Sequence, residues 1–254
     1  MDLLKFLRRN KVSDFEALLK KAVTDPAYRA EFYRRLLTEE IIVITKQNIG
    51  NGGFVKLQED TTVQIFTFEN GSIPVFTSTE RIFDKGVIKH QVFFLACAGE
   101  DLFNFTKGTS LILNPYSDYG KELLPEEITK ILNGSILESN KKELKIKKST
   151  NVLIGQPAKY PTEIVKSLSN FFSNRKDVLK AYVAWIHDPS SDDPPHYIFA
   201  IDTSGDWRNI SDEAGFIANQ ILDKNEFVDF IQITNRGGIN DYFLNDAQPF
   251  YVKQ

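Results

Sequence analysis

Hydrophobic residues recur at helical spacing in the first forty positions of the chain. Residues 13–23 and 25–40 each place their apolar side chains three and four positions apart, which predicts two amphipathic helices packed on a core. Asp25 and Pro26 are residue types that commonly begin a helix. The predicted core faces consist of Phe15, Leu18, Leu19 and Ala22 in the first helix and Tyr28, Phe32 and Leu36 in the second.

Short runs of β-branched and aromatic residues then predict buried strands. These runs cover residues 41–45, 90–98 and 109–113. Residues 61–68 and 72–77 are separated by Asn70-Gly71, a pair that suits a two-residue hairpin turn. Because proline cannot donate a hydrogen bond to a sheet, Pro74 predicts that the second strand of this hairpin lies at a sheet edge.

The second half of the chain alternates strand and helix patterns in a regular order. Strands are predicted over 152–155, 178–187, 196–202 and 226–233, and helices over 161–172 and 206–222. The resulting order β-α-β-β-α-β is that of ferredoxin-like domains. We therefore predict an α+β protein made of two two-layer α/β domains, of which the C-terminal one is ferredoxin-like.

Length and charge divide the chain into two parts. With 254 residues, two domains are the expected number. The stretch 138–150 is rich in lysine and poor in apolar residues, so we predict domains at 1–137 and 151–254 joined by a linker at 138–150. The net charge of −3 gives no reason to expect a nucleic acid or an acidic membrane as partner.

The cysteine content points to a reducing compartment. Cys97 is the single cysteine, so no disulfide forms within the chain. We see no signal peptide and no apolar stretch long enough to span a membrane. These observations predict a cytoplasmic protein, and no motif indicates a cofactor.

The order and spacing of several segments resemble the SseB family. In the first half the segments are DPAYRAEFYRRLL, IIVIT, IPVFTSTERI and GTSLILNPYSDYGKELLPEEI. In the second half they are IGQPAKYPTEIVKSL, VLKAYVAWIHDP, YIFAID and QPFYV. The resemblance implies an SseB N-terminal domain followed by an SseB C-terminal domain in a bacterial cytosolic protein. The family name refers to enhanced serine sensitivity, a property of cells, and brings no catalytic residues to this chain.

The segment LILNPYSDYGKELLPEEI places polar residues between a predicted strand and a predicted helix. Loops at this position often bind ligands in α/β proteins. The candidate ligand-binding residues are Asn114, Ser117, Asp118, Tyr119 and Lys121. The alternative is a plain turn, since Asn-Pro ends a strand and the acidic start of the next helix disfavours an anion.

A second candidate site lies in the segment WIHDPSSDDPPH. If the two flanking strands pair as a hairpin, His187 and His196 become cross-strand neighbours beside Asp188. Two imidazoles and a carboxylate are a known ligand set for catalytic metals. The alternative is a solvated acidic hairpin with two exposed histidines.

Aromatic residues at the surface would suggest a protein partner. The candidate partner surface consists of Phe66, Phe68, Phe76, Tyr242 and Phe243. Since no nucleophile–base pair or cofactor motif is evident, the leading hypothesis is a non-catalytic protein-binding or regulatory module. One alternative is a small-molecule sensor, for an amino acid, that uses a cleft between the domains. Another is a metal-dependent hydrolase at His187 and His196. The oligomeric state stays open.

Overall fold

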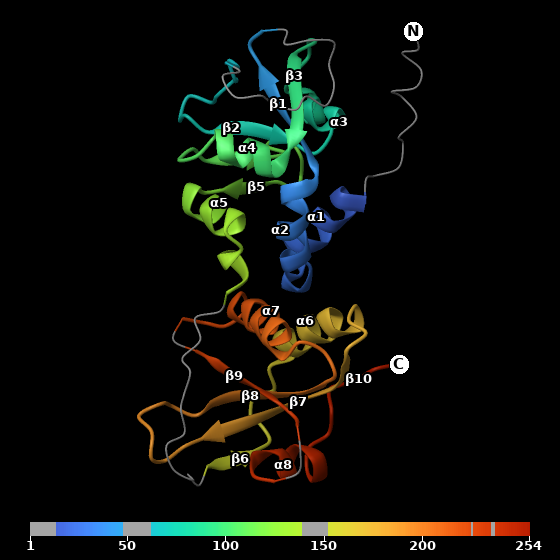
Figure 1. Cartoon of the computed structure of the whole chain (residues 1–254), viewed down its shortest axis with the longest axis vertical. Helices are drawn as coiled ribbons and strands as arrows, with labels where there is room; N and C mark the ends of the chain where they lie inside the picture. Colours follow the sequence, from blue (N-terminus) through green and yellow to red (C-terminus); the bar gives the residue numbers. More distant parts are fainter. Residues whose placement is uncertain (1–13, 48–61, 139–151, 225, 235–236) are drawn as a thin grey trace. The chain divides into compact units, whose positions relative to one another are not determined.

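The computed structural model describes residues 14–47, 62–138, 152–224, 226–234 and 237–254. The predicted linker therefore lies almost entirely outside the described residues. The chain divides into two compact units with the main boundary between residues 136 and 137. Each unit combines one mixed sheet with helices, so the predicted α+β class is confirmed (Figure 1).

The N-terminal unit is built on a five-stranded sheet of order β3-β1-β2-β4-β5. Its strands are β1 (Glu40–Thr45), β2 (Ile73–Phe76), β3 (Phe93–Ala98), β4 (Leu111–Leu113) and β5 (Lys121–Leu123). Its helices are α1 (Asp14–Thr24), α2 (Arg29–Thr38), α3 (Thr79–Ile82), α4 (Gly99–Phe105) and α5 (Pro125–Leu132). Short 3-10 turns cover Pro26–Tyr28 and Asp84–Gly86, and a further one spans Ser135–Leu137.

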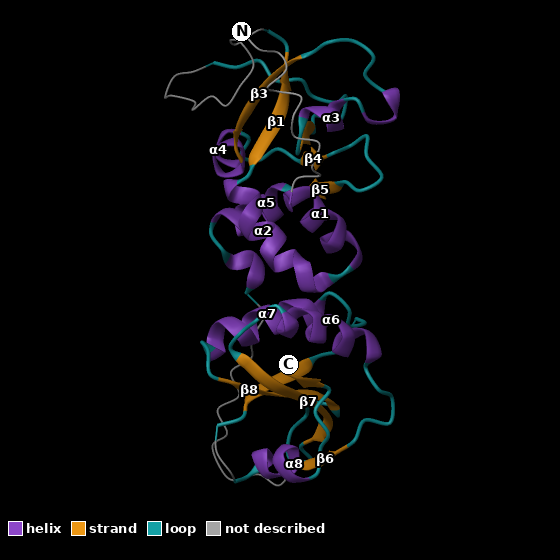
Figure 2. Cartoon of the chain, turned by 90° about the vertical axis from the view of Figure 1, so that its right-hand side faces the viewer, coloured by secondary structure: helices purple, strands orange, loops and turns teal. Residues whose placement is uncertain are grey.

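The core of this unit follows the predicted periodicity. Phe15, Leu18, Leu19 and Ala22 of α1 are all buried, as are Phe32 and Leu36 of α2. Helix α2 contacts α1, α4 and α5, and Figure 2 shows α1, α2 and α5 grouped in one helical layer. On the other face, Ile42, Ile44 and Phe76 pack with Ile82 of α3.

The predicted hairpin around Asn70-Gly71 is only partly formed. Gly71 makes the turn, with a positive φ of 83°, and its amide donates to the carbonyl of Phe68 at 2.9 Å. Residues 62–68 do not form a strand, however: the Phe68 amide donates to the Ser72 carbonyl at 2.9 Å, and the rest of the segment makes an isolated bridge between Ile65 and Thr45. The prediction of a two-stranded hairpin is therefore wrong.

The prediction that Pro74 marks an edge strand is also wrong, because β2 lies in the middle of the sheet between β1 and β4. The missing amide hydrogen still has a visible effect. Strand β1 pairs with β2 only through Ile42 and Val43. Beyond that point the carbonyl of Ile44 accepts a hydrogen bond from the Phe66 amide at 2.9 Å. Strand β1 thus changes partner where proline offers no donor.

The C-terminal unit is a second mixed sheet. Its strands are β6 (Leu153–Gly155), β7 (Val178–His187), β8 (His196–Thr203), β9 (Val228–Gln232) and β10 (Tyr251–Val252), and its helices are α6 (Thr162–Ser173), α7 (Trp207–Asn219) and α8 (Ile239–Asn245). Helices α6 and α7 lie on one face of the sheet (Figure 1). The other face packs on Phe243 of α8, so this unit has a third, smaller layer that the two-layer prediction lacks.

The strand pairing departs from the ferredoxin-like pattern, although the six predicted elements occur in the predicted order. A split β-α-β unit would place another strand between β6 and β7, but β6 pairs directly with β7 and is antiparallel to it. The sheet order is β10-β7-β8-β9, with β6 also on β7. Strands β6 and β10 therefore share one edge of β7, at residues 185–187 and 180–181 respectively. The order of elements alone could not distinguish these two pairings.

Candidate functional site

The predicted ligand loop is the connection of a β-hairpin and does not lead directly into a helix. Residues 121–123 form β5, which pairs antiparallel with β4. Asn114 begins the connection with a left-handed backbone, φ 48°, a conformation that asparagine tolerates better than most residues. Its side chain is fully buried, at 0% exposure.

Asn114 serves the fold by binding Thr77. Its Oδ1 accepts a hydrogen bond from the Thr77 amide at 3.0 Å, and its Nδ2 donates to Thr77 Oγ1 at 3.0 Å. Thr77 follows β2, so the pair fastens the hairpin to the end of the central strand. Because Asn114 is inaccessible and its polar atoms are bound within the protein, its prediction as a ligand-binding residue is wrong.

Arg81 on α3 is the charged centre beneath the loop. Its Nη1 lies 3.0 Å from Asp84 Oδ2 and donates to the Tyr119 hydroxyl at 3.1 Å. Its Nε lies 3.4 Å from Glu16 Oε1, an ion-pair separation without a hydrogen bond. The Ser117 hydroxyl donates to Asp84 Oδ2. Two of the predicted loop residues, Ser117 and Tyr119, thus bind to a charged group of side chains. We name this group the Arg81 cluster, and it consists of Glu16, Arg81, Asp84, Ser117 and Tyr119.

The other two loop residues lie apart from this cluster. Asp118 is exposed and pairs with Lys85 Nζ at 2.6 Å, and the hydrogen bond and charge of Lys85 lower the pKa of the Asp118 carboxyl. Lys121 Nζ lies 2.8 Å from Glu127 Oε1 on α5. Glu127 also accepts a hydrogen bond from the Tyr33 hydroxyl at 2.6 Å, and burial together with that bond raises the pKa of Tyr33.

Three of the cations around the loop are paired with carboxylates, and a fourth, Lys20, lies with its Nζ 4.5 Å from the centroid of the Tyr119 ring. Arg81 faces two carboxylates, and Lys85 and Lys121 each face one. An anionic ligand bound to one of the three paired cations would therefore have to displace a carboxylate. Ser117 donates to the Asp84 carboxylate, which is also held by Arg81, whereas nucleophilic serines are most often paired with an imidazole. The geometry favours the alternative of a structural turn for this loop.

The predicted histidine pair does not form. Strands β7 and β8 do pair as a hairpin, but the partner of His196 is Ile186, and His187 lies opposite Leu153 on β6. Because side chains alternate between the faces of a sheet, this one-residue difference places the two imidazoles on opposite faces. The Asp188 carboxylate accepts hydrogen bonds from the amide and hydroxyl of Ser190 at 2.8 and 2.7 Å, and the charge of the neighbouring His187 also acts on it.

The metal site predicted at His187, Asp188 and His196 is therefore wrong. Among the residues that the structure describes, no three His, Cys, Asp or Glu side chains come together in a group that could hold a metal ion. His196 instead contacts Asp229 and the carbonyl of Pro194. The hydrolase hypothesis loses its site.

The candidate aromatic surface separates into buried and exposed residues. Phe76 and Phe243 are fully buried, at 0% exposure, so both are excluded from a partner surface. Tyr242 is partly buried, and its hydroxyl accepts from Gln156 Nε2 at 3.3 Å. Phe66, at 37% exposure, and the partly buried Phe68 line an open depression of about 660 Å³ that extends over residues 66–70.

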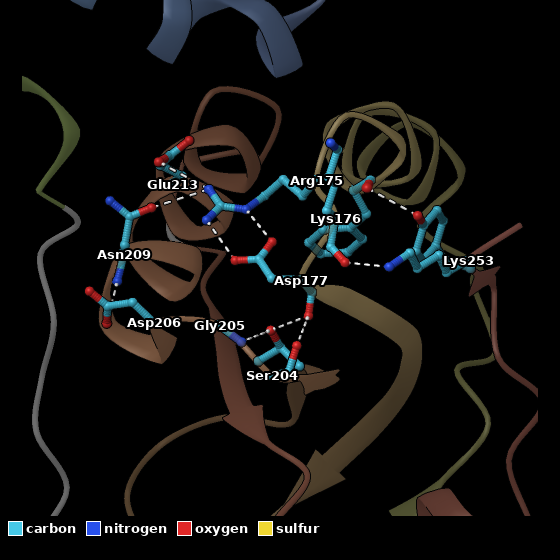
Figure 3. Close-up of polar contacts among 12 residues, drawn as sticks. Arg175, Lys176, Asp177, Ser204, Gly205, Asp206, Asn209, Glu213 and Lys253 are labelled. Carbon is cyan, nitrogen blue, oxygen red and sulfur yellow. Dashed lines mark hydrogen bonds and ion pairs between the residues drawn. The ribbon is translucent and has the colours of Figure 1, made fainter.

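The C-terminal unit holds a second charged cluster that the sequence analysis missed (Figure 3). Arg175 follows α6 and donates from Nε and Nη2 to the two carboxylate oxygens of Asp177, both at 3.2 Å. Its Nη1 donates to Asn209 Oδ1 at 3.1 Å and to Glu213 Oε1 at 3.4 Å. Asn209 and Glu213 lie on α7, so the cluster joins the two helices. We name it the Arg175 cluster: Arg175, Asp177, Asn209 and Glu213.

Asp177 also binds the turn before α7 through its backbone. Its carbonyl accepts from Thr203 Oγ1 at 2.7 Å and from the Ser204 amide at 3.0 Å. A Cβ atom at Gly205 would come within 2.0 Å of the Asp177 carboxylate, so a larger residue there would have to push that side chain aside. The hydrogen bonds and charge of Arg175 lower the pKa of Asp177. An Arg-x-Asp pair carries no sequence signal for such a cluster, because Asn209 and Glu213 come from a separate element, α7.

Cys97 is buried on β3, the edge strand next to β1 in the N-terminal sheet. Burial, together with the charges of Asp101 and Glu40, raises the pKa of its thiol to about 12. The thiolate that nucleophilic cysteines require is therefore scarce at neutral pH.

The family of the chain follows from two matches to family models. Residues 15–130 match the SseB protein N-terminal domain, and residues 146–253 match the SseB protein C-terminal domain. The chain belongs to the SseB family. The resemblance seen in the sequence segments is thereby confirmed.

Two curated SseB-family proteins are similar to this chain over almost its whole length. Protein SseB of Escherichia coli (strain K12) and Protein SseB of Shigella flexneri are each 27% identical over 245 residues. The matched region covers 95% of this chain and 93% of each relative. No solved structure matches the chain significantly. None of the helices in the described part of the chain combines the length and apolar character that a bilayer crossing requires.

Proposed function

We propose that this SseB-family protein is a non-catalytic protein-binding module of the bacterial cytoplasm, and that the aromatic depression at Phe66 and Phe68 is its contact surface. Both clustered arginines are matched by carboxylates within the protein, and the buried thiol is inert. In contrast, the depression leaves part of the Phe66 ring exposed to solvent. The single observation that carries the proposal is the exposed Phe66 ring at the end of an aromatic row, over a depression.

Phe66 is held in place by a row of aromatic rings that leads into the core. The Phe66 and Phe68 rings meet edge to face with centroids 6.0 Å apart. Phe68 meets Tyr116 at 6.5 Å, and Tyr116 meets the fully buried Phe76 at 5.8 Å. An aromatic side chain that is ordered before binding loses little rotamer entropy on binding.

The surroundings of Phe66 also suit a protein partner. Thr67, Glu69 and Asn70 line the same depression, and give it a polar rim. Aromatic residues with polar neighbours are common where a few side chains supply most of a binding free energy. The partner expected here therefore offers an apolar side chain to the depression and hydrogen-bonding groups to its rim.

Site-specific photo-crosslinking in living cells tests this surface. A photoreactive phenylalanine analogue is placed at position 66, and the matched control carries it at Phe105, which is more exposed, at 52%, in the same unit. We expect a discrete crosslinked product at position 66 and none at position 105. The Phe66→Ser variant should bind the captured partner at least about tenfold more weakly, the loss of a moderate hot spot. Equal yields at the two positions, or unchanged binding by Phe66→Ser, would overturn the proposal.

The amino-acid sensor remains an alternative prediction. It depends on a cleft between the two domains, and no feature described within either unit favours it. A panel of amino acids tested by thermal shift distinguishes the two functions, because a ligand that binds the native state raises the melting temperature. A reproducible rise with one amino acid would favour the sensor over the protein-binding module.

A further inference from the structure

His196 stands at the first position of β8 between two oxygen atoms. Its Nδ1 lies 2.8 Å from the carbonyl oxygen of Pro194, and its Nε2 lies 2.9 Å from Asp229 Oδ2 on β9. The ring packs against Phe227, with centroids 4.2 Å apart. The imidazole therefore joins three segments: the loop over residues 188–195, β8 and β9.

Both oxygens can only accept hydrogen bonds. A neutral imidazole carries one N–H, whereas the imidazolium carries two. In the neutral ring, one of the two contacts would set a nitrogen lone pair against an oxygen lone pair. The observed geometry is thus satisfied in full only by the doubly protonated ring.

We propose that His196 is a protonation-controlled latch that fastens the 188–195 loop and the edge strand β9 to the start of β8. When the ring loses a proton, it can donate to Pro194 or to Asp229 but not to both. Either the loop or the edge strand then loses its side-chain bond. As the pH rises, the end of the C-terminal sheet next to the 188–195 loop therefore becomes less firmly held.

The charged groups that face His196 are both acidic. Asp229 contacts it from β9, and Asp193 lies in the adjacent loop. The neighbour on β7 is Ile186, which does not titrate, and the ring on the remaining side is Phe227. Burial acts to lower the pKa of His196, but the bonds to Asp229 and Pro194 and the two negative charges outweigh burial and raise the pKa above the ordinary 6.5.

Because the pKa of His196 is higher in the folded protein than in the unfolded chain, the latch should weaken as the pH rises. The folded protein binds the proton more tightly than the unfolded chain, so the latch contributes fully below pH 6.5, the ordinary pKa of the group. Its contribution falls as the pH rises through the higher pKa of the folded protein. Acidification therefore leaves this contact intact as long as the Asp229 carboxylate stays ionised.

Heteronuclear NMR of the histidine rings tests the latch in the full chain. The chain has three histidines, so single substitutions assign each ring signal. We expect both nitrogens of His196 to show protonated shifts at pH 6 and a titration midpoint above 6.5. The amides of residues 190–193 and 229 should shift with the same midpoint. In Asp229→Asn, which keeps an acceptor but removes the charge, the His196 midpoint should move down.

A second measurement distinguishes a protonation-dependent latch from a histidine that only packs against its neighbours. Hydrogen exchange of the 188–195 loop, corrected for intrinsic exchange rates, should lose protection as the pH passes the His196 midpoint. This loss should move to lower pH in Asp229→Asn and stay unchanged in His90→Gln, the matched control at an exposed histidine. A midpoint at or below 6.5, a ring with one protonated nitrogen at pH 6, or loop protection that ignores the midpoint would each overturn the latch.

Discussion

The Arg81 cluster in the N-terminal unit and the Arg175 cluster in the C-terminal unit use the same set of groups. Each places one arginine between an aspartate and a buried glutamate, and Glu16 and Glu213 are only 4% and 5% exposed. The arginines retain 25% and 21% of their side-chain exposure. Each unit therefore holds a charged group near its core by pairing it at the boundary with solvent.

The two clusters differ in what the aspartate holds. Asp84 accepts the Ser117 hydroxyl, so the N-terminal cluster fixes a loop through side chains. The Asp177 carbonyl accepts from Thr203 and Ser204, so the C-terminal cluster fixes a turn through its backbone, with Gly205 against the carboxylate. The C-terminal turn thus packs directly against the Asp177 carboxylate, whereas the N-terminal loop binds the Asp84 carboxylate through a hydroxyl group.

Removal of the arginine from either cluster should cause the largest loss of stability. Arg81→Met and Arg175→Met should each lower the free energy of unfolding by about 3 kcal/mol, because a buried carboxylate loses its main counter-charge. Both tryptophans, Trp185 and Trp207, lie in the C-terminal unit, so urea unfolding followed by fluorescence reports that unit. We expect a lower fluorescence midpoint in Arg175→Met and a lower far-UV circular dichroism midpoint in Arg81→Met.

The dependence of stability on pH in the acidic range provides a control for the Arg175→Met prediction. Since Arg175 lowers the pKa of Asp177, the pair stabilises the fold above the unfolded pKa of about 3.9 and loses that effect as the pH falls through the folded value. Arg175→Met should flatten this part of the curve. An equal shift of the fluorescence midpoint by Arg81→Met would show that the clusters do not act locally.

Substitution of Gly205 should have an intermediate effect. Gly205→Ala places a methyl group within 2.0 Å of the Asp177 carboxylate and should cost about 2 kcal/mol in urea unfolding, the usual range for overpacking. Gly155→Ala is the matched control, because nothing lies within 4 Å of its added Cβ. Equal costs at the two positions would show that the contact between Gly205 and the Asp177 carboxylate imposes no steric constraint.

Substitution of Asn114 separates its two roles, and Asn114→Gly should have the smallest effect on stability. Asn114→Gly keeps the left-handed backbone and loses the bonds to Thr77, at a cost of about 1 kcal/mol. Asn114→Ala loses the same bonds and adds about 1 kcal/mol for a left-handed alanine. Circular dichroism during urea unfolding measures the difference. If alanine proves no worse than glycine, backbone strain plays no part at this position.

Local patterns predicted much of the fold because they act over a few residues. The apolar faces of α1 and α6 and the buried run of β1 are visible in the spacing of their own side chains. The position of β2 in the middle of the sheet was not predicted. Pro74 suggested a sheet edge, but in the structure it leaves β2 central and makes β1 change its pairing partner. Helix α8 was missed because its seven residues are too few for a periodic signal.

The candidate sites were predicted less well for a related reason. Ser117 and Tyr119 do lie at a charged cluster, but its centre, Arg81, comes from another element that no spacing rule connects to the loop. The histidine pair failed by a single position of register, which is enough to move a side chain to the opposite face. Contacts between distant segments set both outcomes.

The shared edge of β7 has a consequence for synthesis of the protein. Its two partners, β6 and β10, are the first and last strands of the C-terminal unit, so translation must pass residue 252 before that edge is covered. The N-terminal unit is complete long before then and can fold while the ribosome is still at work. Until β10 arrives, the nascent C-terminal unit exposes an open strand edge, the kind of surface that chaperones shield.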